Sequence, residues 1–550
     1  MAFYTHPCPH RKHMNSVYVA LAVVAALFAL CPQVEGAPFP PPQFRNCRSL
    51  DGCCPPVNRK PPVPFQLPTN LPWRTRRAAQ LVDAAYIAKY HRAYGLMRAL
   101  PNSDPRSLYA QARMHCAYCG GAFYFPNSAY PLEIHDGWFF FPWHRMFLYF
   151  HERILASLIG DPTFTLPFWN WDNQSPIAPL GNLVPRYMSE AYWNRRPNPL
   201  YNRNRNRCAL PPFLIDLNSG VGCVRMSSAR SILTENNRLM YTQMVSGATT
   251  PSLFHGSTYR FRWMGGMGGG TLEGAPHGTV HIFTGNPYAK NPYDDMGNLN
   301  VAALDPLFYA HHANIDRLWE VWKGMGGRRR DLTDPDYLRS QFIFYDENKR
   351  LVSVSVRQVL SLRNLRYGYQ RVANPWMNPR AFGMGVMSSD DMDMSGASME
   401  AAKCSSLQYS DVSALVKASP LLENSGNVLS IEPLTFRVRR LDPTGSWQEI
   451  LVIENIAIDW TQTAKINAFL FHPSASGSSI DCMEFFSTFA HIPEAHHRKK
   501  KGYTRSWKLG LTEKLVQLGL SQVSHAVITL VQVGSDQQIK FGSARILLED

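Results

Sequence analysis

The stretch IHDGWFFFPWHRMFLYFHERIL (134–155) decides how this 550-residue chain is interpreted. It is crowded with large apolar side chains, and yet it contains three histidines: His135, His144 and His151. Pro142 suits the first turn of a helix and Gly160 suits its end, so we expect a buried helix over 142–159. Imidazoles in so dry a surrounding need a partner, and a metal ion can be that partner.

Two further regions add histidines on neighbouring helices. The segment 104–119 begins with Asp and Pro, as helices often do, and carries His115. PHGTVHIF places two histidines four residues apart, which puts both on one helix face, and HHANIDRLW adds a histidine pair. The chain thus holds two sets that can each offer three imidazoles: His115, His135 and His144 in one, and His277, His281 and either His311 or His312 in the other.

Three histidines per ion suit copper or zinc. Neither set supplies an acidic ligand, which disfavours magnesium, calcium and non-haem iron. Two adjacent trihistidine sites in an apolar surround favour a pair of copper ions that handle dioxygen, because imidazole supports both oxidation states of copper. Isolated buried histidines are more often core residues that bond to the backbone, and we assign that role to His91, His151 and His255.

These motifs resemble the plant-type polyphenol oxidases, the catechol oxidase and tyrosinase branch of the type-3 copper proteins. The resemblance covers nearly everything after residue 36 and rests on HCAYC, FFPWHRMFLYFHERIL, PFWNWD, PHGTVHIFTGNP, DPLFYAHHANIDRLWEVW, FIFYDEN, YGY and KLGLTEKLVQLG. It implies a mainly α catalytic domain, in which a four-helix bundle holds a dicopper site, followed by a C-terminal β-sandwich domain. It also implies oxidation of o-diphenols (catechols) to o-quinones, with reduction of dioxygen to water, by a chain made as a latent proenzyme.

The resemblance also assigns roles to single residues. It implies that His115, His135 and His144 bind the first copper and that His277, His281 and His312 bind the second. His312 is preferred to His311 because the family's ligand stands seven residues after the Asp of its DP motif. Cys119 matches a cysteine that forms a thioether to His135, Glu273 matches a carboxylate that holds a water near the metals, and Asp316 is expected to accept a hydrogen bond from a ligand histidine.

Two positions depart from the usual pattern of the family. Leu299 stands at the gate over the second copper, where Phe is common, and a smaller gate would admit bulkier phenols. Gly278 follows His277, where members that hydroxylate monophenols often carry Asn, and its presence favours o-diphenol oxidation. The alternatives are a tyrosinase-type monophenol hydroxylase and a haemocyanin-like oxygen-binding protein; the plant-type C-terminal domain and the single copper unit argue against the latter.

Eleven cysteines fit an oxidising compartment. Four of them, Cys47, Cys53, Cys54 and Cys116, could form two bridges, and Cys208 and Cys223 could close a loop. Spacing alone leaves the connectivity open. The resemblance implies the pairs Cys53–Cys116 and Cys47–Cys54.

Composition divides the chain into four parts. A basic start, the apolar run 17–31 and small residues give residues 1–36 the pattern of a secretory signal peptide. Residues 37–382 would form the dicopper catalytic domain, which is helical at first and strand-like from 331. Residues 383–427 are rich in Gly, Ser, Met and Asp and predict a flexible linker in which a protease could cut and activate the enzyme. Residues 428–550 alternate apolar and polar side chains, as the strands of a shielding β-sandwich do.

The leader and the charge set the expected surroundings. We expect the secretory pathway, with the extracellular space, cell wall or vacuole as destination, rather than a plastid, because the start lacks the Ser- and Arg-rich character of a transit peptide. The formal net charge of +15 would favour adhesion to acidic wall polymers. No nucleic-acid motif is present, and we expect no membrane association after signal cleavage. The expected partners are small phenols, dioxygen and an activating protease.

Overall fold

The structure is a computed structural model. It describes residues 36–48, 52–56, 60–125, 132–218, 222–225, 230–264, 267–378, 409–422, 427–442, 444–477, 479–494 and 504–549. The predicted leader up to residue 35 and residues 379–408 of the predicted linker region lie outside these ranges. Within them, no helix has both the length and the apolar character that a membrane span requires.

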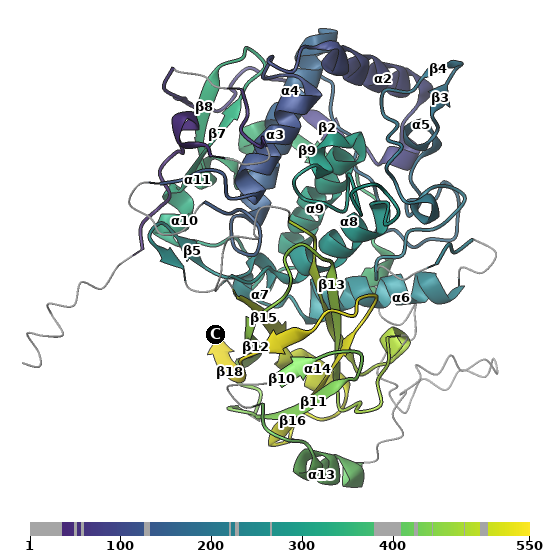
Figure 1. Ribbon diagram of the computed structural model, residues 1–550, viewed down its shortest axis with the longest axis vertical. Coiled ribbons are helices and arrows are strands. Elements are labelled where there is room, and N and C mark those ends of the chain that lie inside the picture. Colours follow the sequence, from purple (N-terminus) through teal and green to yellow (C-terminus); the bar gives the residue numbers. More distant parts are fainter. Residues whose placement is uncertain are drawn as a thin grey trace, which may run out of the picture.

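A body built mainly of helices adjoins a smaller body built mainly of strands (Figure 1). Four long helices form the centre of the first body: α2 (Ala84–Ala99), α3 (Leu108–Cys119), α4 (Phe140–Ile159) and α9 (Pro306–Gly324). Helix α4 packs against α2 and α9, and α3 packs against α2. Gly160 ends α4 in the left-handed conformation, with φ of 67°, so the end of this helix is where the sequence predicts it.

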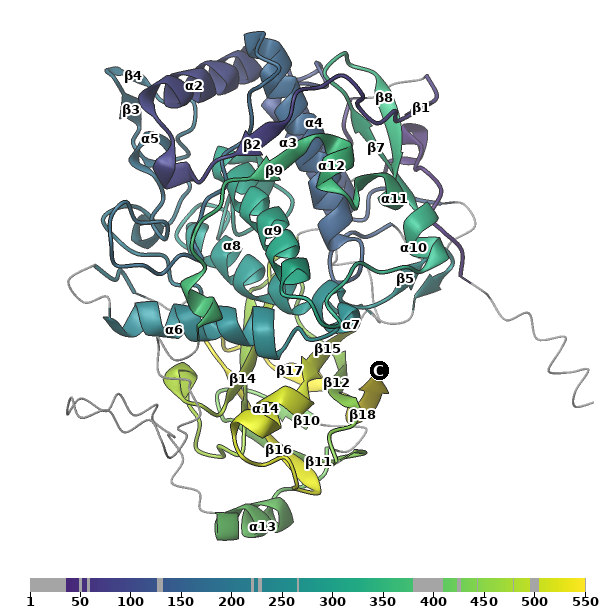
Figure 2. The ribbon, with the colours of Figure 1, turned by 180° about the vertical axis from the view of Figure 1, so that it is seen from behind.

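Shorter elements surround the bundle. The turn Glu273–Gly278 runs directly into α8 (Thr279–Thr284), and α6 (Arg230–Tyr241) lies at the boundary with the strand-built body (Figure 2). Other short elements of this body include α5 (Arg186–Ser189), α7 (Pro251–His255), α10 (Pro335–Arg339), α11 (Val356–Val359), α12 (Leu362–Leu365), β3 (Tyr192–Trp193), β4 (Arg196–Pro197), β5 (Tyr259–Arg260) and β6 (Trp263–Met264).

The Pro-rich N-terminal stretch is fastened along the helical body. Strand β1 (Val63–Pro64) pairs in parallel with β8 (Leu351–Ser355), and β8 pairs antiparallel with β7 (Gln341–Tyr345). Strand β2 (Arg74–Arg76) pairs in parallel with β9 (Tyr367–Tyr369). The disulfides Cys47–Cys54 and Cys53–Cys116 tie the same stretch to itself and to α3, and Cys208–Cys223 closes a separate loop. These three pairs are those that the sequence analysis named.

The C-terminal body is a sandwich of two antiparallel sheets. One has the strand order β11-β16-β13-β14 and the other β15-β12-β18, with β10 and β17 paired beside them. The bounds are β10 (Asn427–Leu429), β11 (Leu434–Arg439), β12 (Gln448–Ile456), β13 (Ala464–Leu470), β14 (Phe485–His491), β15 (Arg505–Gly510), α14 (Leu511–Gln517), β16 (His525–Gln532), β17 (Ile539–Phe541) and β18 (Ser543–Glu549).

Strand β13 explains how the two bodies join. Every residue of β13 is buried, although a strand in a two-layer sandwich usually exposes one face. Its alternate residues Ile466 and Ala468 lie in the sandwich core, whereas Phe469 lies in the core of the helical body. The second face of this sheet therefore packs on the helical body, and the predicted fold class, a mainly α domain followed by a β-sandwich, is confirmed.

Part of the predicted linker is helical. Helix α13 (Tyr409–Ala418) packs against β16, and its residue Val412 lies in the sandwich core. The rest of the linker is outside the described residues apart from short pieces beside this helix and β10. The domain limits at residues 36, 382 and 427 stay predictions.

Candidate metal centre

Seven buried histidines form two groups in the middle of the helical bundle. One group holds His115, His135 and His144, and the other holds His277, His281, His311 and His312; within each group the nitrogens lie within 4.8 Å of one another. The two groups face each other, since the rings of His144 and His312 stack at 4.1 Å with an interplanar angle of 7°. The rings of His135 and His277 lie 6.1 Å apart. All the histidines of the two predicted sets therefore belong to these two facing groups.

Backbone carbonyls fix the orientation of three of these rings. Nδ1 of His144 lies 2.8 Å from the carbonyl of Phe140, Nδ1 of His277 lies 2.9 Å from that of Glu273, and Nδ1 of His281 lies 2.5 Å from that of Met296. A carbonyl oxygen only accepts hydrogen bonds, so each Nδ1 carries the proton and each Nε2 keeps its lone pair. Within the second group, Nε2 of His281 lies 3.3 Å from Nε2 of His312, so these two nitrogens converge.

The neighbouring histidines His311 and His312 differ in what they can offer. The indole N–H of Trp171 donates to Nδ1 of His311 at 3.0 Å. An indole has no acceptor, so Nδ1 of His311 holds the lone pair and its Nε2 holds the proton. His311 therefore presents an N–H to the centre. No described donor occupies Nδ1 of His312, so this ring can carry its proton there and keep the lone pair on Nε2. This favours His312 as the ligand, as the resemblance implied.

Burial keeps these imidazoles neutral. Desolvation lowers the pKa of His135 to about 3 and that of His281 to about 4. It also lowers the pKa of His115, His144, His277 and His312, and neighbouring imidazoles add to that effect. A neutral imidazole is the form that binds a metal. Buried neutral nitrogen donors in two facing sets, with no carboxylate in either set, fit copper best.

Glu273 lies between the metal centre and the C-terminal body. Its Oε1 accepts the backbone N–H of Asp136 at 2.7 Å, and its own carbonyl holds His277. Burial, reinforced by the charge of Asp136, raises the pKa of Glu273. A Cβ at Gly269 would lie 2.9 Å from Glu273 Oε2, so a larger residue there would push this carboxylate aside. Glu273 is thus a buried carboxylate whose backbone carbonyl contacts a predicted ligand histidine, and its role in holding a water stays a prediction.

Cys119 is buried and carries a free thiol. Its Sγ lies 3.7 Å from Nδ1 of His115 and donates to the carbonyl of Leu299 at 3.4 Å. None of the contacts described for this thiol joins it to His135. The thioether between Cys119 and His135 stays a prediction.

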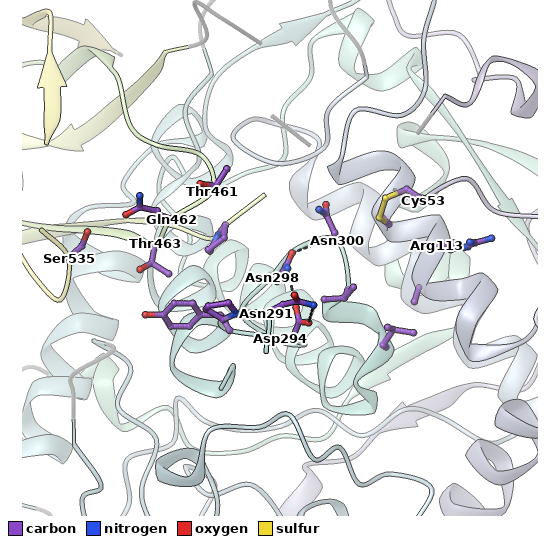
Figure 3. Close-up of a pocket in the computed structure, with 18 of the residues that line it drawn as sticks. Cys53, Arg113, Asn291, Asp294, Asn298, Asn300, Thr461, Gln462, Thr463 and Ser535 are labelled. Atoms are coloured by element: carbon purple, nitrogen blue, oxygen red, sulfur yellow. Dashed lines mark hydrogen bonds between the residues drawn. A yellow bond between two sulfur atoms is a disulfide. The ribbon is translucent and has the colours of Figure 1, made fainter. Parts of the chain in front are cut away.

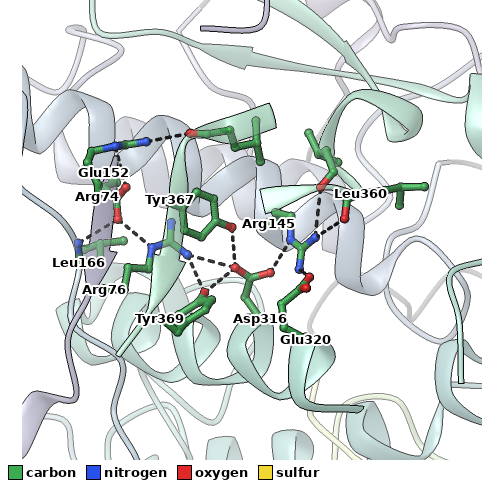
Figure 4. Close-up of polar contacts among 12 residues, drawn as sticks. Arg74, Arg76, Arg145, Glu152, Leu166, Asp316, Glu320, Leu360, Tyr367 and Tyr369 are labelled. Carbon is green, nitrogen blue, oxygen red and sulfur yellow. Dashed lines mark hydrogen bonds and ion pairs between the residues drawn. The ribbon is translucent and has the colours of Figure 1, made fainter. Parts of the chain in front are cut away.

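Asp316 has a different role from the one predicted (Figure 4). Arg145 donates to its Oδ1 at 2.5 Å, while Arg76 at 3.1 Å, Tyr367 at 2.6 Å and Tyr369 donate to its Oδ2. It accepts from no histidine among the described contacts, so the expectation that it steadies a ligand ring is wrong. The backbone carbonyls named above orient the rings instead, and Asp316 ties α9 to α4 and to the β2–β9 pair.

The C-terminal body covers the gate. The backbone N–H of Leu299 donates to the carbonyl of Pro493 at 3.3 Å, and the Leu299 side chain is buried in a cluster with Ile492. A Cβ at Gly278 would lie 3.3 Å from the Cβ of Ala490. The two positions singled out in the sequence thus lie under residues 490–493, which sequence analysis did not identify. Residues 490 and 491 end strand β14 and residues 492 and 493 follow it, and nothing in their sequence marks them as contacts of the gate.

A buried arginine forms a second contact between the bodies. Arg505, on β15, lies 2.5 Å from Oδ2 of Asp136, the residue that follows His135. It also lies 2.8 Å from Nδ1 of His491 and 3.5 Å from Glu494, both in the C-terminal body. The backbone N–H of Ser506 donates to the carbonyl of Met267 at 2.6 Å. The C-terminal body therefore places a positive charge next to a predicted metal ligand, and no residue pattern around Arg505 indicates this contact.

The three histidines assigned to the core lie outside the centre. Nε2 of His151 bonds to the hydroxyl of Tyr94 at 2.9 Å, and Nε2 of His91 lies 3.0 Å from the carbonyl of Tyr187. His255 is enclosed by aromatic rings, among them Phe141 at 5.4 Å and Trp319 at 5.6 Å. None of the three belongs to either histidine group.

Comparison with known proteins shows what this architecture is similar to. The chain matches the common central domain of tyrosinase over residues 105–325, the polyphenol oxidase middle domain over 331–381 and the chloroplastic polyphenol oxidase C-terminal domain over 419–548. It is 38% identical over 525 residues to the latent form of a chloroplastic polyphenol oxidase of Prunus armeniaca, covering 92% of this chain and 82% of that protein. It is also 38% identical over 532 residues to a chloroplastic polyphenol oxidase of Vitis vinifera, covering 94% and 84%.

Solved structures give the same result. Latent apple tyrosinase matches with a TM-score of 0.74 at 36% identity, over 89% of this chain and 100% of that one. A latent aurone synthase matches with a TM-score of 0.79 at 29% identity, over 93% and 99%.

The comparisons overturn one prediction. The relatives from apricot, grape, apple, broad bean and tomato are all named chloroplastic. The predicted secretory route, to the cell wall or vacuole, is therefore wrong, and the names point to the plastid. An apolar run followed by small residues marks export across a membrane, but it does not identify which membrane is crossed.

Proposed function

Since the chain belongs to the tyrosinase family, in its plant polyphenol oxidase branch, we propose that two copper ions in the histidine centre carry its oxidation of o-diphenols to o-quinones. The observation that carries this proposal is the pair of facing histidine groups, with buried, neutral rings whose free nitrogens converge. We assign the first ion to His115, His135 and His144, and the second to His277, His281 and His312. Copper at these sites would supply the electron transfer to dioxygen and the binding of the phenol oxygens.

The protein side chains prepare the site for this chemistry. The rings of Phe140 and Phe308 pack against the histidines, at 4.6 Å from His277 and 4.3 Å from His312, and exclude water from the centre. Glu273, whose pKa is raised by burial, takes up the proton that a catechol hydroxyl loses on binding, through a water that it holds. Leu299 and Gly278 border the approach and leave space for the substrate ring.

Gly278 bears on the choice of phenol. Monophenol hydroxylation also needs the substrate proton to be removed, and a polar side chain next to His277 would assist Glu273 in that step. Gly278 offers no polar atom beyond its backbone. We therefore propose that the enzyme acts on o-diphenols in preference to monophenols.

The C-terminal body keeps the full-length enzyme latent. Ile492 and Ala490 lie over Leu299 and Gly278, so a phenol cannot reach the histidines while this body is in place. Cleavage within 383–427 would release it, and an activating protease is the implied partner. By analogy with the names of the relatives, we place the enzyme in the plastid. Import of the labelled full-length precursor into isolated plastids tests that location.

The central experiment measures copper content and oxygen uptake on the full-length protein, before and after mild proteolysis, with catechol and tyrosol in parallel. We expect two copper ions per chain, little uptake before proteolysis and catechol-dependent uptake after it, with tyrosol a poor substrate. The variant Ile492→Ala should raise uptake before proteolysis, whereas Val516→Ala, at an exposed position on α14, should not. One copper per chain, or no catechol uptake after cleavage, would contradict the proposal.

A further inference from the structure

A cavity of about 1080 Å³ lies between the two bodies, and none of the roles assigned above uses it (Figure 3). Its wall on the helical body comes from residues 52–53, from α3 and from the segment 291–304. Its wall on the C-terminal body comes from residues 461–463, Pro493 and 534–536. The volume matches or exceeds that of most pockets that enclose a small organic molecule.

The cavity adjoins the gate segment. Asn298 and Asn300 line it, and they flank Leu299 in the sequence. Pro493, which also lines it, holds the backbone of Leu299. On α3, Arg113 and Cys116 face the cavity, and His115 lies between them in the sequence. The cavity and the histidine centre therefore share α3 and the gate segment as a common wall.

The lining is rich in neutral hydrogen-bonding groups. Asparagine side chains come from one wall, and hydroxyl and amide side chains come from the other, among them Thr461, Gln462, Thr463 and Ser535. The lining contains one arginine, Arg113, and two carboxylates, Asp294 and Asp536, so the cavity has no surplus of positive charge for a phosphate or a carboxylic acid. A fully apolar ligand would leave these polar groups without partners. The lining fits a neutral ligand with many hydroxyl groups.

The asparagine wall is held in position before any ligand arrives. Asn291 and Asn298 donate to the two oxygens of Asp294, at 3.0 Å and 3.1 Å, and the backbone N–H of Asn300 donates to Oδ1 of Asn298 at 3.2 Å. A wall that is already rigid reduces the cost of ordering that a hydroxyl-bearing ligand meets on binding. Tyr109 and Tyr293 add aromatic rings to the lining on the side of the helical body.

We propose that this cavity is a subsite for the neutral, polyhydroxylated part of a conjugated phenol, such as the sugar of a phenol glycoside, whose ring is directed at Leu299. This rests on the proposed function, because the subsite extends the same phenol-oxidising centre. In the full-length chain both walls contact the sugar. After release of the C-terminal body the asparagine wall remains, next to the opened gate.

The test uses the full-length protein and phenyl β-D-glucopyranoside, which has no free phenolic hydroxyl and is not oxidised. Binding is measured by calorimetry and by ligand-detected NMR, with phenol and phenyl phosphate as comparison ligands. The double variant Asn300→Leu/Thr463→Val removes one hydrogen-bonding side chain from each wall at nearly constant volume. No hydrogen bond through either side chain is described, so the fold should be kept. The matched control is Asn364→Leu/Thr333→Val, at exposed positions away from the cavity.

We expect the glucoside to bind more tightly than phenol or phenyl phosphate, and the double variant to bind it about tenfold more weakly while the control binds as the wild type does. Equal binding by the double variant, tighter binding of phenyl phosphate, or no binding of the glucoside would overturn the subsite. Binding needs no turnover, so a lost subsite with normal catechol oxidation refutes only this inference. Intact binding without catechol oxidation refutes only the proposed function.

Discussion

Replacing Arg505 with Gln should open the latent enzyme without proteolysis. Arg505 is 4% exposed and lies 2.5 Å from Asp136, which is 13% exposed. This ion pair joins the two bodies, because Arg505 belongs to the sandwich and Asp136 follows His135 in the helical body. The glutamine keeps a polar side chain in place but removes the charge that faces Asp136 and Glu494.

The size of the effect follows from this burial. Removing one partner of a buried ion pair costs about 3–5 kcal/mol, because the other charge stays in a dry surrounding. The lower figure applies, since Asp136 keeps some contact with water and regains full hydration once the bodies separate. About 3 kcal/mol corresponds to roughly a 100-fold shift in the ratio of closed to open chains. Uptake of oxygen with catechol, measured before proteolysis, should rise by about that factor, up to the level of the cleaved enzyme.

The control is Arg545→Gln. Arg545 pairs with Glu454 inside the sandwich at 2.9 Å, with side chains 51% and 31% exposed, and such exposed pairs contribute little. It should leave latency unchanged. Thermal melts and copper content verify that both variants are folded and loaded. If the Arg505 variant stays as latent as the wild type, while its cleaved form oxidises catechol normally, the ion pair does not hold the bodies together.

Three further predictions concern the centre and the core. His312→Gln should lose about half of the bound copper, whereas His311→Gln should keep nearly all of it, as metal analysis of the purified variants would show. Equal losses would refute the assignment of the His311 proton to Nε2, which rests on the hydrogen bond from Trp171. Asp316→Asn should lower the free energy of unfolding by about 3–5 kcal/mol in a urea titration, because Arg145 and Arg76 then face a neutral group. Burial by itself raises the pKa of Asp316, but the two arginines hold this pKa below its ordinary value of 3.8. The ion pairs of Asp316 therefore stabilise the fold fully above pH 3.8, and this contribution is lost as the pH falls through the lower pKa of the folded state. The Asp316→Asn variant should lack this acid-sensitive contribution to the free energy of unfolding. Burial also lowers the pKa of Lys514 to about 7, so the wild type should gain stability as the pH rises from about 7 towards 10.5. Lys514→Met should show a smaller gain when melting temperatures are compared, because Lys465, whose pKa burial lowers to about 8, still contributes in this window.

The sequence predicted the parts of the site that are set by local spacing. His277 and His281 share a helix face because four residues separate them, and the helix that carries His144 ends at Gly160 as its residues indicate. What the sequence could not show is which distant residue reaches a given side chain. Asp316 stands one turn from His312, which suggested a bond to a ligand ring. Arg145 and Arg76, from remote parts of the chain, take its oxygens instead.

Contacts between the bodies were missed for the same reason. Nothing in the residues around Ile492 or Arg505 indicates that they meet the gate or Asp136, since such contacts depend on how one folded body is placed on another. The predicted destination was wrong because the apolar run in residues 17–31 indicates transport across a membrane but does not indicate which membrane. The choice between His311 and His312, in contrast, became a physical argument only when the position of Trp171 was known.

The pairing of β2 with β9 bears on how stable the catalytic body is after proteolytic cleavage. These strands lie near the two ends of the catalytic body, and they run side by side with Arg76 bonded to Tyr369. A protease that removes everything beyond residue 378 would leave β2 and β9 paired. Unfolding of the remaining body could then not begin at β9 without breaking this pair. The catalytic body that remains after cleavage should then resist further proteolysis better than the rest of the chain.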